Sequence, residues 1–516
     1  MHEIILVFHD FREKLYNSIE ETLKNFIIFV LIGFFLSACS PYDTQIKREY
    51  DTQHYTQTYK TLQKATKNKS NDWLLWKMQS GFLTFSYFGA HFSIDDLEQA
   101  EVQFKIYEEK GLLSSVGENV GATLSNDMAM PYHGMIFEGV LLNFYKALAF
   151  SSLGDNVQAR IEFNRANDRQ RRAKEYYSKE IKKAHDETIK EANEEAKSTF
   201  YETNTKDSEL NNILNTKYTN LGQFAVYKDM INPLIPYVSG LYFMIEKDFT
   251  KSIDLLKESY GISKAQLVAR DMQLLESRKG KIEYPKFTWV IIEDGSLARK
   301  KELTISQPLV TGNGINTINL ALPDFVNGKP TYSAYKINAT DADLIGNVSN
   351  LFASEFEKQL PSIITRAIVG ALVKFGITSA ISAAGSEYGA IIGLASALAF
   401  RATTAADLRS SIVLSDSVWM ARIPNTESSI KVYGNNDMLL EIPITKECNA
   451  RAARIASKDQ LDALIKAKPK DVSARIKFFK RYYENGNEDR LCVLTDNIIY
   501  LRVHRGTVAH TVIKGD

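Results

Sequence analysis

The chain has 516 residues, with 63 Lys and Arg against 62 Asp and Glu, a formal net charge of +1, and only three cysteines. This length exceeds one compact core and predicts roughly two to four domains. The near-neutral charge excludes a whole-protein field that attracts nucleic acid, and three cysteines exclude a disulfide-dense scaffold. A hydrophobic content of 44% indicates a folded protein, not a disordered chain or a collagen-like fibre.

An apolar segment near the N-terminus has the pattern of an export signal. It runs from Phe26 to Leu36, follows Lys24, and is shorter than the roughly 20 residues of a membrane-spanning helix. The residues Leu36-Ser37-Ala38-Cys39 at its end resemble the lipobox of bacterial lipoproteins, whose cysteine is lipidated and becomes the first residue after cleavage. The resemblance implies a removed signal over residues 1–38 and a lipid on Cys39. An ordinary signal peptide is the alternative.

A lipid on this cysteine implies a protein of the bacterial outer membrane that faces the periplasm. By analogy with enterobacterial sorting, Ser40 rather than Asp after the cysteine favours that membrane, and several acyl chains hold a protein there without spanning it. The stretch Met1–Thr22 is acidic for the front of a signal, which predicts a later translation start. Cys448 and Cys492 either form a disulfide in that oxidising compartment or remain free thiols.

The N-terminal half is expected to be helical. Residues 39–70 are polar with few aliphatic side chains, which predicts a tether carrying the lipid. Over residues 71–283 apolar residues recur at helical spacing between turn signals, which predicts helical hairpins. Two hairpins resemble tetratricopeptide repeats, because small and aromatic residues stand where paired helices approach closely. The matching residues are Ala147, Phe150, Ala159, Phe163 and Ala166 around the turn Gly154-Asp155, and Gly240, Phe243, Ser252, Leu256 and Ser259 around Lys247-Asp248.

This repeat pattern is incomplete. The position that usually holds a tryptophan-like residue is Asn143 in the first hairpin and Pro236 in the second. A generic bundle of helical hairpins is the alternative. Between the two lies a long polar stretch, Arg160 to about Glu202, which predicts a helix that begins basic and ends acidic.

Three arginines of the basic portion, Arg165, Arg169 and Arg172, are candidate partner-binding residues. Arginine docks acidic groups through paired hydrogen bonds, so a basic helix end is a candidate surface for a partner. A solvated helix held by charge pairs four residues apart is the alternative.

Short motifs along the chain resemble a family of uncharacterised bacterial envelope lipoproteins. The matching residues are Leu124 to Asp127, Pro131-Tyr132, Gly134, Glu138, Tyr145 to Ala147, Gly154-Asp155, Ala159-Arg160, Arg165 to Asn167, Arg169-Gln170, Ala406 to Ser410, and Ala421-Arg422. Where an aromatic residue is expected after Ser410, this chain has Ser411. The family combines a lipobox, repeat-like helices and a mixed C-terminal region, and has no assigned activity. Some members are encoded near activators of peptidoglycan synthesis, which implies a role in that process or in envelope assembly.

Strand-like patterns begin after Glu276, and residues 284–447 are predicted to be β-rich. Lys286–Glu293 and Ser296–Ile305 flank Asp294-Gly295, which predicts a hairpin, and Asn313-Gly314 marks a second turn. Both faces of the first strand are apolar, which predicts a central strand. The expected fold class is therefore α+β, with repeat-like helices followed by a β-sandwich-like unit.

A helical insertion over residues 350–410 interrupts the β-rich region. Its apolar residues recur every four positions: Phe352, Phe356, Leu360, Ile364, Ile368 and Leu372. Gly385, Gly389 and Gly393 share one helix face, which allows close helix contact. A buried helix crossing, membrane insertion and self-association through this face remain open, although Glu387 divides the apolar run into segments below the spanning length.

The last segment, residues 448–516, is predicted to be an appendage. It holds a basic helical stretch, Ala450–Glu484, and a hairpin of Ile498–Val503 with Thr507–Ile513. Another hairpin, Ile430–Tyr433 with Met438–Ile444, precedes it.

Patterns for catalysis and metal binding are sparse. The eight histidines are scattered, no cysteine spacing suits zinc, and we expect neither a metal nor a cofactor. One group of residues could perform acid–base chemistry on a glycan, and all of its members except His133 are also candidate partner-binding residues. This group is Asn126, Asp127, Tyr132, His133 and Glu138. An Asn-Asp turn before a helix explains the same residues structurally.

Together these patterns predict a non-catalytic, lipid-anchored scaffold. Its repeat-like helices would bind another envelope protein. The alternative is a peptidoglycan-modifying enzyme that uses Asp127 and Glu138.

Overall fold

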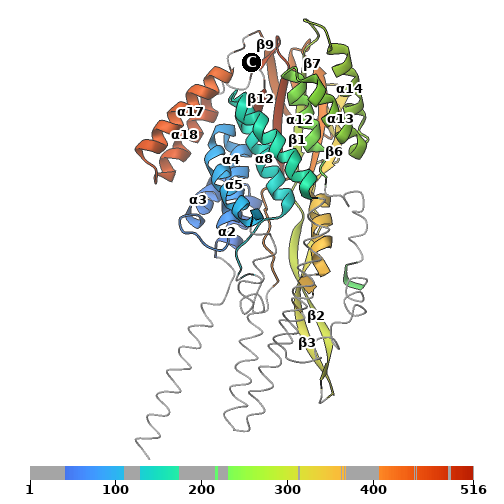
Figure 1. Cartoon of the computed structure of the whole chain (residues 1–516). Coiled ribbons are helices and arrows are strands. Elements are labelled where there is room, and N and C mark those ends of the chain that lie inside the picture. The colour runs from blue at the N-terminus through green and yellow to red at the C-terminus, as the bar shows by residue number, and fades with distance from the viewer. Residues whose placement is uncertain are drawn as a thin grey trace, which may run out of the picture.

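A computed structural model describes residues 41–109, 128, 130–173, 216–218, 231–311, 314–361, 363–364, 367, 406–446, 448, 450–485 and 490–514. The predicted α+β fold is confirmed, since helices make up the N-terminal part and strands dominate the C-terminal part (Figure 1). The lipidation candidate Cys39, the polar residues Asn126 and Asp127, and the three spaced glycines lie outside the described residues.

The N-terminal part is built from packed helices. They are α2 (Pro41–Asp51), α3 (Tyr55–Ala65), α4 (Trp73–Phe88), the short 3-10 helix η1 (Ala90–Phe92), α5 (Ile94–Glu109), α8 (Ile136–Ser152), a helix over residues 156–173, α12 (Leu234–Ile245), α13 (Phe249–Ser263) and α14 (Gln266–Arg278). Every residue of α8, and every residue of α4 except Trp73, is buried. A helix that is buried on all sides lies inside the protein, so these two are the central helices.

Both predicted hairpin turns are confirmed. Gly154 has φ +72°, and the carboxylate of Asp155 accepts a hydrogen bond from the backbone N–H of Gln158 at 3.0 Å. Lys247 has φ +62°, and the carboxylate of Asp248 accepts from the N–H of Lys251 at 3.3 Å. In each turn a left-handed residue ends one helix and an aspartate caps the next.

The strands form two five-stranded sheets and a separate ribbon. The first sheet has the order β12 (Thr507–Lys514), β11 (Asn497–His504), β1 (Phe287–Asp294), β7 (Ser417–Pro424) and β6 (Asp343–Asn347). The second has the order β10 (Leu491–Cys492), β9 (Asp437–Thr445), β8 (Ser429–Gly434), β4 (Tyr335–Ile337) and β5 (Thr340–Asp341). The central place predicted for β1 is confirmed, and so are the hairpins β8–β9 and β11–β12.

The hairpin predicted around Asp294-Gly295 is wrong. β1 pairs with β11 in parallel and with β7 in antiparallel orientation, while β2 (Arg299–Thr311) pairs with β3 (Gly314–Val326) to form the ribbon. Gly295 does turn the chain, with φ +79°. Its N–H, however, donates to the carbonyl of Val503 in β11, and the chain then leaves the first sheet. A turn residue determines where the chain changes direction, but it does not determine which strands pair with each other.

The tether predicted over residues 39–70 is also wrong for its described part. Helices α2 and α3 belong to the main hydrophobic core, where Ile46, Tyr50, Tyr59 and Leu62 are almost fully buried. Tyrosine carries a large apolar ring, so a segment poor in aliphatic residues still buries enough area to pack.

The segment predicted to be a C-terminal appendage contributes strands to both sheets. It supplies β10, β11 and β12, and β11 lies between β12 and β1. The basic helical stretch is confirmed as helical, but it forms two helices, α17 (Ala450–Ala467) and α18 (Val472–Asn485). Figure 1 shows this pair projecting from the side of the body.

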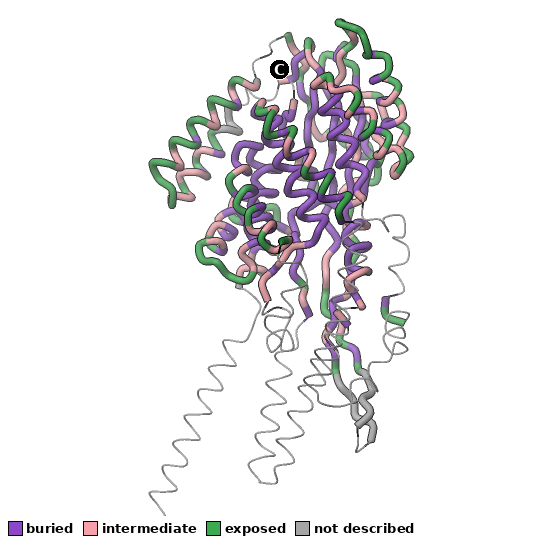
Figure 2. Tube along the Cα trace, in the orientation of Figure 1, coloured by how far each residue is buried: buried purple, intermediate pink, exposed green. Residues whose placement is uncertain are grey.

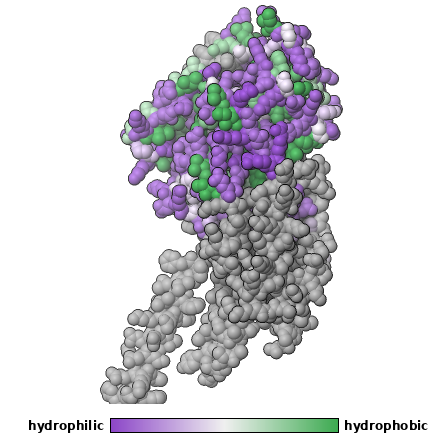
Figure 3. All heavy atoms as spheres, viewed as in Figure 1, coloured by the Kyte–Doolittle hydropathy of each residue, from purple (hydrophilic) through white to green (hydrophobic). Residues whose placement is uncertain are grey.

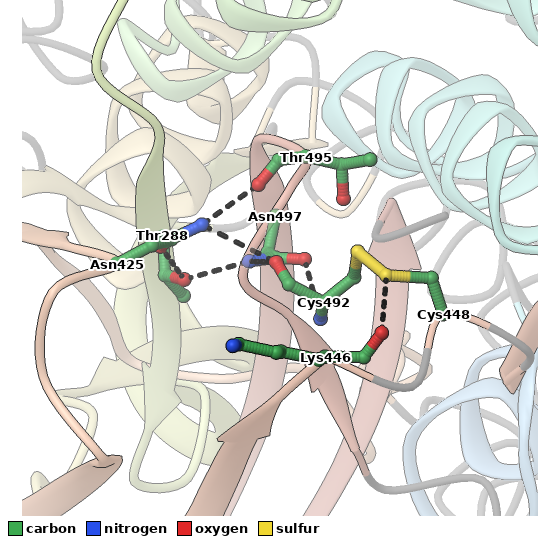
Figure 4. The surroundings of a disulfide bond; sticks show 7 residues. All are labelled: Thr288, Asn425, Lys446, Cys448, Cys492, Thr495 and Asn497. Carbon is green, nitrogen blue, oxygen red and sulfur yellow. Dashed lines mark hydrogen bonds between the residues drawn. A yellow bond between two sulfur atoms is a disulfide. The ribbon is translucent and has the colours of Figure 1, made fainter.

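A disulfide joins Cys448 to Cys492 across 44 residues, with their Cα atoms 5.0 Å apart. It connects the two chain segments that flank α17 and α18 (Figure 4). The carbonyl of Cys492 accepts hydrogen bonds from the side-chain amides of Asn425 (3.3 Å) and Asn497 (3.0 Å). The bond therefore fixes the base of the helical pair to the strands.

Buried residues run through the centre of the molecule (Figure 2) and form two cores, one on each face of the first sheet. Alternate side chains of β1 point to opposite faces of the first sheet. Trp289 and Ile291 belong to the core shared with the helices, whereas Val290 and Ile292 belong to the core shared with the second sheet. The first sheet therefore lies between the helices and the second sheet.

The predicted insertion begins with a helix over residues 348–361. Its residues Phe352 and Phe356 are buried and pack against Phe325 of β3, with ring centroids 5.4 and 6.0 Å apart. The rest of the insertion up to residue 405 is mostly outside the described residues. Among the helices that the structure describes, none has the length and hydropathy needed to cross a bilayer.

Candidate functional site

Two candidate partner-binding residues, Tyr132 and Glu138, are buried, so neither side chain is accessible to a partner in this fold. The carboxylate of Glu138 accepts hydrogen bonds from the Tyr132 hydroxyl (2.6 Å), the Met135 N–H (2.9 Å) and the Ser411 N–H (3.0 Å). Burial raises the pKa of Glu138 above its ordinary value, although these hydrogen bonds favour its charged form. Glu138 stands in the first turn of α8 and satisfies backbone groups there.

The same burial bears on the glycan-active alternative. A glycosidic bond must be flanked by two accessible carboxyl groups. Glu138 has no exposed surface, and Asp127 lies outside the described residues. No group of three or more metal-ligating side chains occurs within the described ranges.

Arg169 is a third candidate partner-binding residue that is buried. Its guanidinium donates to both carboxylate oxygens of Glu108 at 2.9 Å, to the carbonyl of Gly139 at 2.9 Å, and to the side-chain oxygen of Asn143. It also lies over the ring of Phe104, 5.0 Å from the centroid. Arg169 therefore joins α5, α8 and the helix 156–173, and the prediction failed because its partners come from two other helices.

A buried charge network continues beside Arg169. Lys146 pairs with Glu101 and, at 3.1 Å, with Glu162, while the side-chain amide of Asn143 donates to both carboxylates. Burial opposes ionisation of Glu101, but the ammonium group of Lys146 and the hydrogen bonds outweigh it and lower the pKa of Glu101 to about 2. The sequence signal for this network was Asn143, a polar residue where the repeat pattern has an aromatic one.

A second buried network joins the helices to the first sheet. Glu293 of β1 accepts hydrogen bonds from the hydroxyls of Tyr145 (2.6 Å) and Tyr500 (2.8 Å), and burial raises the pKa of Glu293. Beside it, Arg502 of β11 donates to the carbonyl of Gly295 at 2.7 Å and to the hydroxyl of Tyr50 at 3.1 Å. No local motif marks these residues, because they meet only through the fold.

A serine–histidine contact lies next to this second network. His504 Nε2 is 3.1 Å from Ser296 Oγ, and His504 Nδ1 is 2.9 Å from the hydroxyl of Tyr55. Burial and the charge of Arg502 lower the pKa of His504 to about 3. Because His504 is fully buried, it holds together α3, β11 and the Ser296 turn and does not face solvent.

The remaining predicted arginines are exposed. The side chain of Arg165 is 44% exposed although it contacts Glu162 at 2.6 Å, and Arg172 follows two turns later on the same helix. On neighbouring α5, Val102 and Ile106 are 64% and 40% exposed and stand one turn apart. We call these four residues the outer-helix face.

A cavity of about 840 Å³ opens on another side of the described structure, between α3, α4, α18, β9 and β12. Tyr55, Tyr87, Phe88 and Phe479 form its aromatic walls. Such a volume falls within the range of small-molecule sites. None of the site residues predicted from the sequence lines this cavity.

Comparison with protein-family models, with curated proteins and with solved structures gave no match.

Proposed function

We propose that this protein is a lipid-anchored lipoprotein of the bacterial outer membrane that binds another envelope protein without catalysis, in peptidoglycan synthesis or envelope assembly. Its helices act as a tetratricopeptide-like scaffold and its two sheets as a sandwich-like support. The common direction of the outer helices carries the proposal.

The outer helices of successive pairs run side by side in the same direction. Arg165 reaches Glu101, and Arg169, one turn further along the helix 156–173, reaches Glu108, further along α5. On the other side of the same helix, Arg160 pairs with Asp248 at 2.5 Å and Arg171 pairs with Glu258 at 2.6 Å. In each pair of neighbouring helices, a later residue of one helix contacts a later residue of the other, so the helices run parallel. The outer helices of stacked helical repeats are arranged in the same way.

Close helix contact within the last pair supports the same arrangement. A Cβ atom on Gly240 of α12 would come within 2.9 Å of Leu256 of α13, so only glycine fits without a shift. Ser252 Oγ donates to the carbonyl of Gly240 at 2.7 Å, and Ser259 Oγ donates to that of Pro233 at 2.8 Å. The two serines that replace alanine in the repeat pattern thus satisfy backbone carbonyls at the helix crossing.

The inner helices are covered by the chain itself. Tyr145 of α8 binds Glu293 of β1, and Ser152 of the same helix donates to the carbonyl of Val512 in β12 at 2.7 Å. A partner can therefore meet only the outer helices of the stack. Figure 3 shows one side of the molecule as mostly hydrophilic with small hydrophobic spots. Val102 and Ile106 of α5 are exposed apolar side chains, and such side chains often anchor a partner.

The test combines variants of the outer-helix face with a matched control. Ile106→Asp together with Arg172→Glu should abolish function in cells and crosslinking from position 102, while the protein stays at its normal level in the membrane. Ile282→Asp is the control, because Ile282 is 94% exposed and lies apart from the helical stack, between α14 and β1. Full function in the double variant would contradict the proposed surface. Mass spectrometry that finds an unmodified Cys39 would contradict the anchor.

A further inference from the structure

The cavity between α3, α4, α18, β9 and β12 is apolar inside and polar at its mouth. Tyr55 and Tyr87 stack with ring centroids 3.7 Å apart, and Phe88 and Phe479 stack at 5.1 Å. Gln53, His54, Gln57 and Lys480 also line the cavity and are exposed. A ligand would therefore insert an apolar part and leave a polar end in water.

The apolar side chains that line the cavity are recessed. Tyr87, Phe88, Ile476 and Phe479 line the cavity, yet each keeps less than a tenth of its surface exposed. An α-helix with its side chains is about 10 Å or more across and could not reach such recessed rings without moving a wall. A slender, unbranched chain can reach them.

The charge at the mouth is of one sign. Among the fifteen residues that line the cavity, Lys480 contributes an ammonium group, and the set contains neither Asp nor Glu. A carboxylate or phosphate at the polar end of a ligand would find a cation there and meet no lining carboxylate.

We propose that this cavity binds an anionic amphiphile, a single acyl chain that carries one acidic headgroup. The chain lies against the stacked rings, where burial of its methylene groups favours binding. The headgroup lies at the mouth beside Lys480. This site is separate from the outer-helix face and does not depend on it.

The probes are cis-parinaric acid, a fluorescent fatty acid, and the corresponding alcohol, which keeps the chain and lacks the charge. They are titrated into the mature protein made as Cys39→Ser, so that no acyl chain of the protein itself competes. Both probes should bind saturably. Lys480→Gln should weaken binding of the acid about twofold to fivefold and leave that of the alcohol unchanged.

Two further variants complete the test. Lys477→Gln is the matched control, because Lys477 is exposed on the same helix and does not line the cavity, and it should change neither affinity. Ala509→Trp or, independently, Leu440→Trp should fill the cavity and remove binding of both probes. Absence of saturable binding, an equal effect of Lys480→Gln on acid and alcohol, or full binding by both folded tryptophan variants would overturn the proposal. Displacement by oleate or by lysophosphatidylglycerol would tell a carboxylate headgroup from a phosphate one.

Discussion

The buried pair Arg278–Asp496 gives the sharpest prediction of stability. The guanidinium at the end of α14 donates to the two carboxylate oxygens of Asp496 at 3.0 and 2.9 Å, and to the carbonyl of Pro285 at 3.1 Å. The two side chains are 1% and 3% exposed. Asp496 also accepts from the N–H of Phe287 at 3.0 Å, so it ties α14 to the beginning of β1.

Arg278→Met keeps most of the aliphatic volume and removes the charge. It leaves the Asp496 carboxylate buried with a single backbone donor, and breaking such a pair costs about 3–5 kcal/mol. Asp496→Leu leaves the guanidinium buried and should cost a similar amount. The double variant removes both charges and leaves mainly the Phe287 N–H unsatisfied, which costs about 1–3 kcal/mol.

The assay is equilibrium unfolding in urea followed by far-UV circular dichroism, with the free energy of unfolding extrapolated to water. The double variant should be more stable than either single variant, although it carries both changes. The reasoning is refuted if each single change costs less than about 1 kcal/mol, the range of an exposed pair. It is also refuted if the two losses simply add.

Three other outcomes are expected. Reduction of Cys448–Cys492, which closes a loop with a separation of 44 residues, should lower the free energy of unfolding by about 4 kcal/mol and shift the urea midpoint, and an unchanged midpoint would contradict this. His504 has a pKa of about 3 in the folded protein and 6.5 as its ordinary value, so the unfolded chain binds more protons between these pH values and stability falls as the pH decreases from 6.5 towards 3. His504→Gln should flatten that slope in urea unfolding at several pH values, and an unaltered slope would count against the burial of His504. Gly154→Ala should lower the melting temperature by the equivalent of about 1–2 kcal/mol, because φ is +72° and a Cβ would collide with the side chain of Arg451. Gly261→Ala in α13 should raise the melting temperature, because its Cβ meets nothing within 4 Å. Shifts of the same sign in the two variants would contradict this reasoning.

The sequence predicts turns and hairpins correctly where residues a few positions apart determine the backbone conformation. The turns at Gly154-Asp155 and Lys247-Asp248 and the hairpin of β11 with β12 follow from residues a few positions apart. The partners of β1 did not follow, because β11 lies about 200 residues further along and any apolar strand could have paired with it. The packing of α2 and α3 was missed because their core residues include tyrosines, which composition alone counts as polar.

The candidate site was less predictable for a related reason. Glu138 and Arg169 were chosen as charged residues in a motif, and an isolated charge normally faces water. In the fold each finds partners on other elements, Ser411 for Glu138 and Glu108 for Arg169, and both become buried. No sequence motif marks the residues that line the cavity, because they come from separate chain segments near residues 55, 88, 440, 479 and 508.

The place of β11 beside the central strand β1 bears on when the chain can complete its fold. A chain that is synthesised from its N-terminus presents β1 long before its parallel neighbour β11 has emerged. Until then α4 and α8 lack the surface on which they rest, since Ser86 contacts Tyr500 and Ser152 binds Val512. These two helices therefore cannot complete their packing before the C-terminal strands have been synthesised. Without β11 and β12, β1 would become an edge strand of the first sheet, so the packing of α4 and α8 depends on the C-terminal strands.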